Sequence, residues 1–95
     1  MNRDARIAAA PHAAFRRLSG AEGGVLLHLE STAYFRVNEL GATIWQVVQE
    51  GVTLEALVQR VRGTLDAPPA DLADDVTQFI EDLAARDLVV IAPVS

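Results

Sequence analysis

The chain has 95 residues, a hydrophobic fraction of 51% and no cysteine, which suits one small domain with a packed core. The lack of cysteine excludes disulfides, thiolate catalysis and cysteine-rich zinc sites. The formal charge of −5 argues against a nucleic-acid partner, because binding to phosphates depends largely on Lys and Arg.

The first segment has no clear hydrophobic period. We therefore expect residues 1–10 to be a flexible N-terminal tail that ends before Pro11, with a single domain over residues 11–95. No apolar run approaches the roughly 20 residues that a membrane-spanning helix requires. Residues 1–15 also lack the apolar centre of a secretory signal, so we expect a cytoplasmic protein with no membrane partner.

Three short segments alternate apolar and polar side chains in the manner of half-buried strands: 12–18, 25–30 and 32–37. The glycine-rich segment 19–24 predicts a turn between the first two, and the three together indicate an antiparallel meander. The third segment has two faces, with Ala33, Phe35 and Val37 on one and Thr32, Tyr34 and Arg36 on the other.

Three later segments place apolar residues at the spacing of a helix. Asn38 and Thr53 suit the N-caps of the first two helices, and Pro69 suits the first turn of the third. The expected helices are 39–49, 54–65 and 70–87, and the β-branched residues of 88–92 predict a short final strand. This order indicates an α+β, winged helix-turn-helix-like fold: a three-stranded antiparallel sheet followed by three helices and a short C-terminal strand.

The third helix has an apolar stripe wider than a simple core requires. Its centre consists of Leu72, Val76, Phe79 and Leu83. The stripe continues on one side only, through Ala73, Thr77, Ile80 and Ala84. These four residues either pack in the core, which periodicity alone favours, or form a shelf for a bound peptide. If the outer edge of strand 32–37 lies unpaired beside this shelf, a peptide can bind there as an added strand.

Two stretches resemble the PqqD family: "GVLLHLESTAYFRVNELGATIWQVVQEGVTLEALVQRV" and "DLADDVTQFIEDLAARDLV". The matching residues span about 23–91 and are Leu26, Leu27, Asn38, Gly41, Ile44, Trp45, Gly51, Thr53, Leu57, Asp75, Val76, Phe79, Leu83, Leu88 and Val89. Members that act in pyrroloquinoline quinone synthesis usually have a Tyr-Pro-Glu-Gly type hairpin, whereas this chain reads "HLESTAYFRVN". The resemblance therefore favours a relative that serves another pathway, such as lasso-peptide synthesis or a system linked to a radical enzyme.

The resemblance implies a non-catalytic recognition element for the leader region of a ribosomally made precursor peptide. The leader is expected to bind as an added strand between the third strand and the third helix, without a cofactor. The expected partner enzyme is a radical SAM enzyme, a peptidase or a cyclase. The expected peptide-binding residues are Thr32, Ala33, Tyr34, Phe35, Arg36, Val37, Ala73, Thr77, Ile80 and Ala84.

Other functions have less support in the residues. A winged-helix DNA-binding regulator is the main alternative, but its third helix would be basic, and here Arg86 stands against five acidic residues between 71 and 82. Ser19 and Ser31 form no recognisable constellation with a base. We expect no metal site, because His12 and His28 lie in different predicted strands. An open strand edge can also pair with a second copy, so a homodimer remains an alternative.

Overall fold

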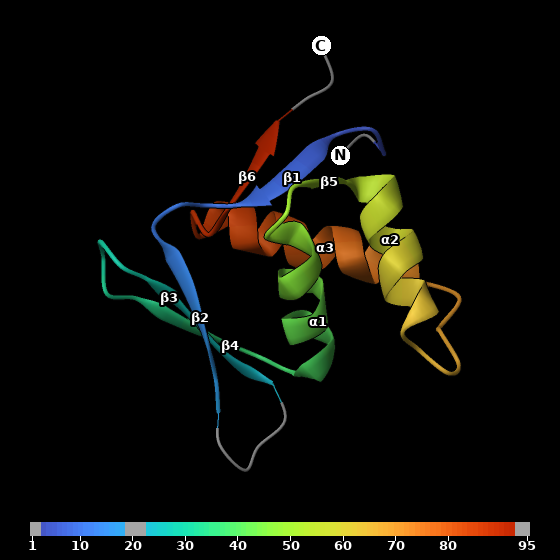
Figure 1. The fold of residues 1–95 in the computed structure, drawn as a ribbon, viewed down its shortest axis with the longest axis horizontal. Helices are drawn as coiled ribbons and strands as arrows, with labels where there is room; N and C mark the ends of the chain where they lie inside the picture. The colour runs from blue at the N-terminus through green and yellow to red at the C-terminus, as the bar shows by residue number, and fades with distance from the viewer. Residues whose placement is uncertain (1–2, 19–22, 93–95) are drawn as a thin grey trace.

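The computed structural model describes residues 3–18 and 23–92, and Figure 1 shows their arrangement. The elements in chain order are β1 (Arg6–Ala9), β2 (Ala13–Arg17), β3 (Gly24–His28), β4 (Tyr34–Val37), α1 (Glu39–Val48), β5 (Val52–Thr53), α2 (Leu54–Gly63), α3 (Leu72–Ala85) and β6 (Val89–Ala92). The α+β class, the antiparallel sheet β2-β3-β4 and the three helices are confirmed. Four residues of the predicted turn, 19–22, lie outside the described residues.

The N-terminal segment is a strand, so the prediction of a flexible tail is wrong for residues 3–10. β1 is the middle strand of a second antiparallel sheet of order β5-β1-β6, visible at the top of Figure 1. Ile7 pairs with Val52 on one side and with Ile91 on the other, and its side chain is fully buried. The strand escaped prediction because its partners are distant in the sequence and its other apolar residues are alanines.

The junction between β4 and α1 is held by three polar contacts. The Asn38 side chain accepts a hydrogen bond from the Gly41 amide at 2.9 Å, which confirms the predicted N-cap. The next residue, Glu39, accepts from the Gly23 amide at 3.0 Å and from Arg17 at 3.1 Å. The Gly23 hydrogen bond, followed by that from Arg17, lowers the pKa of the Glu39 carboxyl from its ordinary value. These contacts tie the end of β4 to the start of β3 and to the end of β2.

The main core lies between the three helices and both sheets. Trp45 of α1 is 1% exposed, and Leu26 of β3 and Ile7 of β1 are fully buried in the same cluster. The predicted centre of the third helix is confirmed for Leu72, Val76 and Leu83, which are fully buried. The fourth residue of that stripe, Phe79, is only partly buried and packs against the edge of the core.

Gly41 leaves room for the ring of Phe79 beside α1. A Cβ atom at position 41 would lie 2.9 Å from the Val37 Cβ and 3.1 Å from the Phe79 ring. Gly41→Ala is therefore expected to destabilise the domain, because overpacking costs about 1–3 kcal/mol and the gain in helix propensity is about 1 kcal/mol. Thermal unfolding measures this as a lower Tm.

Gly63 provides the matched control for this substitution. It is the last residue of α2, and a Cβ atom there would have no neighbour within 4 Å. Gly63→Ala should leave the Tm unchanged or raise it. Equal effects at the two positions would contradict the close packing of α1 against Val37 and Phe79.

Candidate functional site

One edge of the sheet β2-β3-β4 is open. β4 pairs with β3, and no strand among residues 3–18 and 23–92 pairs with its other edge. The His28 amide donates to the Ala33 carbonyl at 2.9 Å, which makes these two residues a hydrogen-bonded pair. Such pairs alternate along an antiparallel ladder, so Phe35 and Val37 bond to β3. The backbone amides and carbonyls of Tyr34 and Arg36 therefore point toward the open edge.

The side chains of β4 connect this strand to α3. The Phe35 ring is partly buried and stacks against the Phe79 ring of α3, with 6.4 Å between the ring centroids. The Arg86 guanidinium, just after α3, lies 4.3 Å from the centroid of the same Phe35 ring. The side of α3 that faces β4 is therefore the side of Phe79 and Arg86.

A small pocket lies where the start of β4 meets the end of α3. Its walls combine apolar groups with two nitrogen-bearing side chains, and the lining residues are His28, Ala33, Tyr34, Phe35, Arg86 and Leu88. The Tyr34 side chain, 70% exposed, stands at its rim. We call the open edge of β4 together with this pocket and the Phe79 and Arg86 side of α3 the β4 groove.

The strand residues of the predicted site all lie along this groove or in the hairpin before it. Thr32, Ala33, Tyr34 and Arg36 are exposed, and Phe35 is half-buried. Val37 is 7% exposed and belongs to the core. Thr32 has a φ of 61°, in the left-handed region that favours glycine, so the hairpin without its usual glycine closes at the cost of a strained threonine.

The helix residues of the predicted site lie elsewhere. Ile80 has no exposed surface and belongs to the core, so the prediction that its side chain contacts a peptide is wrong. Ala73 and Ala84 are half-buried against that core. Thr77 lies two residues from Phe79, which is about 200° around a helix. The wide apolar stripe thus serves packing. The side of α3 that lies beside β4 is the one that carries Phe79 and Arg86.

Sequence reasoning missed the helix residues that do reach β4. The apolar stripe predicts a core position for Phe79, and Arg86 enters the sequence analysis only through its charge. These two residues are seven apart, which is two turns of a helix, so the spacing places them on one side. That spacing was the available signal, but it does not reveal which side of the helix faces the strand.

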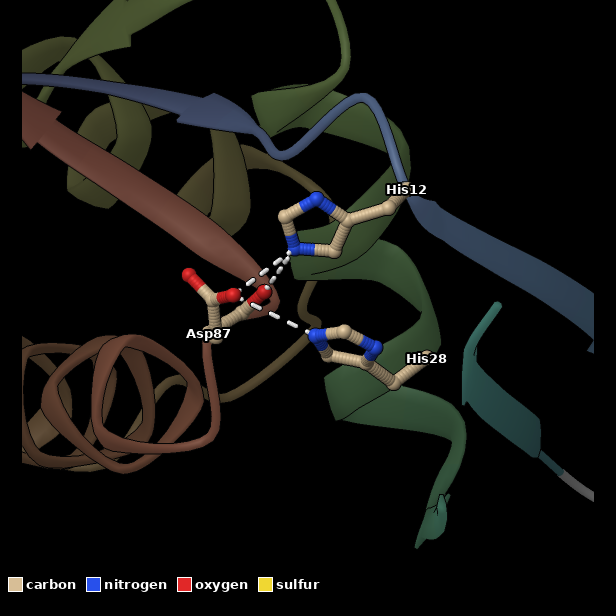
Figure 2. Close-up of side chains that lie close together, drawn as sticks. All are labelled: His12, His28 and Asp87. Carbon is tan, nitrogen blue, oxygen red and sulfur yellow. Dashed lines mark hydrogen bonds and ion pairs between the residues drawn. The ribbon is translucent and has the colours of Figure 1, made fainter. Parts of the chain in front are cut away.

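The two histidines also meet, although their strands differ. His12 immediately precedes β2, and the register pairs its neighbour Ala13 with His28 of β3. Their rings lie 4.3 Å apart, and both approach the carboxylate of Asp87, between α3 and β6 (Figure 2). The hydrogen bond from His28, with smaller contributions from His12, lowers the pKa of the Asp87 carboxyl from its ordinary value.

In residues 3–18 and 23–92, we find no helix that combines the length and the apolar character needed to cross a membrane.

The fold and the groove define a class: a small α+β domain in which an open sheet edge lies beside a helix. Residues 23–89 match the family described as coenzyme PQQ synthesis protein D (PqqD). The match covers more than half of the chain, so the protein belongs to the PqqD family. The family resemblance read from the sequence is therefore confirmed.

Two solved structures share the fold. One is described as TbiB1 in complex with the TbiA(beta) leader peptide; it is 23% identical, has a TM-score of 0.73, and the match covers 86% of this chain and 93% of that one. The other is lasso peptide synthetase B1 complexed with the leader peptide, 19% identical with a TM-score of 0.71, covering 88% and 96%. Comparison with curated proteins gave no significant match. Neither structure tests the winged-helix description, which stays a prediction.

Proposed function

We propose that this protein binds the leader region of a ribosomally made precursor peptide in the β4 groove. The leader adds a strand to the open edge of β4 and directs alternate side chains toward Phe79 and Arg86 of α3. This keeps the predicted strand half of the site and replaces the predicted helix half. The observation that carries the proposal is the outward direction of the backbone groups of Tyr34 and Arg36.

The relatives support the same function. TbiB1 and lasso peptide synthetase B1 are both described in complex with leader peptides, and both share the fold over more than four fifths of this chain. An unpaired edge offers a row of donors and acceptors, so a strand that covers it satisfies groups that otherwise bond to water. The pocket at the end of the groove adds side-chain selectivity to this backbone pairing.

The proposed role is recruitment without catalysis. A bound leader holds the rest of the precursor near the modifying enzyme, which raises its effective concentration and fixes its approach. A radical SAM enzyme, a peptidase or a cyclase remains the proposed partner. The edge of β4 is also the place where a second copy would pair, so leader binding and edge-mediated dimerisation should exclude each other.

The test is fluorescence polarisation with labelled leader peptides from short open reading frames encoded beside this gene. We expect saturable binding with a Kd in the micromolar range or tighter. Arg86→Ala should weaken binding about fivefold, because it removes the cation over Phe35 and one wall of the pocket.

Thr77→Ala is the matched truncation on the other side of α3, and it should change the Kd by less than about twofold. Loss of binding in Thr77→Ala with retention in Arg86→Ala would move the site to the opposite side of the helix. If none of the leader peptides encoded beside this gene binds, the proposed function is wrong.

A further inference from the structure

The side-chain cluster of His12, His28 and Asp87 has the composition and spacing of a transition-metal site. One ligand atom from each residue lies within 4.8 Å of the other two. The Asp87 Oδ2 atom is 3.0 Å from the His12 Nε2 atom and 3.2 Å from the His28 Nε2 atom. Figure 2 shows both rings directing these nitrogens at the carboxylate.

These distances are close to those that zinc requires. Tetrahedral Zn²⁺ with bonds of 2.0–2.2 Å separates its ligand atoms by about 3.4 Å. Two imidazoles and one carboxylate are also a ligand set that binds zinc and leaves further positions open. The arrangement therefore needs only a small opening of the two histidines around a central ion.

We propose that His12, His28 and Asp87 bind Zn²⁺, with water in the remaining position. The three ligands come from the start of β2, the end of β3 and the turn between α3 and β6. A bound ion would thus join the sheet β2-β3-β4 to the end of α3. His28 also lines the pocket of the β4 groove, so the ion would lie at the end of that groove.

Zinc must displace the hydrogen on the Nε2 atom of each histidine, and the hydrogen bonds of the cluster show that these hydrogens are there. The His12 Nε2 atom lies 2.7 Å from the Asp87 carbonyl, which can only accept, so this nitrogen carries a hydrogen when no ion is bound. The Ser31 amide donates to the His28 Nδ1 atom at 3.2 Å, so a neutral His28 carries its hydrogen on Nε2.

Binding of Zn²⁺ through both Nε2 atoms moves each of these hydrogens to the Nδ1 atom of the same ring. At His12 that hydrogen would face Glu30, whose carboxylate lies 3.6 Å from Nδ1, an arrangement common behind metal-bound histidines. At His28, a hydrogen on Nδ1 takes the place of the lone pair that accepts the hydrogen bond from the Ser31 amide. The hydrogen bond from Ser31 must therefore break, and the hairpin after β3 must move when zinc binds.

The experiment is titration of the full chain, free of any histidine tag, with Zn²⁺ and separately with Co²⁺. We expect one ion per chain by calorimetry, visible absorption from the Co²⁺ complex, and a shift of the Ser31 amide signal in NMR spectra. At a hundredfold excess of Zn²⁺ over its Kd, the Tm should rise by about 10–20 °C.

The sequence makes the variants informative, because it contains two histidines and no cysteine. His12→Gln, His28→Gln and Asp87→Asn should each lower the affinity for Zn²⁺ at least tenfold. Asparagine also tolerates the positive φ of Asp87, so that variant should fold. Asp74→Asn, on the exposed surface of α3, is the control and should bind as the unmodified chain does.

Two results would overturn the proposal. The first is no binding, or equal binding by all four variants. The second is binding without a change at Ser31, since that would leave His28 outside the coordination. Either result would make the cluster a hydrogen-bonded link between the hairpin and α3, with Asp87 accepting from both rings. Leader binding is not needed for any of these measurements, so they test the metal site separately from the proposed function.

Discussion

Arg36→Pro is expected to weaken leader binding at least thirtyfold and to leave the domain folded. The Arg36 amide points to the open edge of β4, away from β3, so its removal deletes no hydrogen bond within the sheet. Proline is tolerated on an edge strand for this reason. An added strand would lose one backbone hydrogen bond, worth about 1 kcal/mol, and would meet the proline ring at the same position.

Arg36→Ala separates the backbone from the side chain. It keeps the amide, so it should bind the leader within about threefold of the unmodified chain, whereas Arg36→Pro should bind at least thirtyfold more weakly. Polarisation measures the affinity, and circular dichroism confirms that both variants fold. Equal affinity in the two variants would show that no strand pairs with β4, and the proposed binding mode would fail.

Ile80→Arg is expected to prevent folding. Ile80 has no exposed surface and lies among the fully buried residues of α3, which include Val76 and Leu83. A guanidinium at this position would lose its hydration without gaining an anionic partner, since no buried polar or charged residue occurs among the described residues. The penalty of several kcal/mol is comparable with the free energy of unfolding of a domain of this size, which is usually about 5–15 kcal/mol.

Gln78→Arg places the same side chain two residues away, on the exposed surface of α3. It should retain the Tm of the unmodified chain within a few degrees, because arginine suits a helix and Asp82 lies within reach of position 78. A folded Ile80→Arg that binds the leader normally would contradict the burial of Ile80. If the Ile80→Arg variant folds but does not bind the leader, Ile80 belongs to the peptide site after all.

Local patterns in the sequence were sufficient for most of the elements. Alternation revealed β2, β3 and β4, and the caps at Asn38 and Thr53 marked the starts of α1 and α2, where the side chains accept from Gly41 and Ala56. These signals depend on neighbours within a few residues. β1 was missed because its stability comes from strands about 45 and 84 residues later, which leave no trace in its own short sequence.

The same distinction between local patterns and contacts with distant residues applies to the candidate site. The strand half follows from a period of two and from an edge that nothing in residues 3–18 and 23–92 covers. The helix half does not follow from local patterns, because periodicity defines the sides of a helix but not their directions in the fold. The side that contacts β4 carries Phe79 and Arg86, and the predicted residues Ala73, Thr77, Ile80 and Ala84 lie on another side. Ile80 and Phe79 are adjacent in sequence, yet only the three-dimensional packing shows that Phe79 is the one that meets Phe35.

The position of β1 also affects the order in which parts of the protein can fold during synthesis. Ile7 leaves the ribosome early, but its partner Ile91, on the neighbouring strand β6, is made 84 residues later. The hairpin of β3 and β4 has both of its strands within residues 24–37 and can form long before that. The open edge of β4 is therefore exposed to its surroundings while the apolar strand β1 is still unpaired. A nascent chain with these properties is open to chaperones and to premature pairing until β6 closes the second sheet.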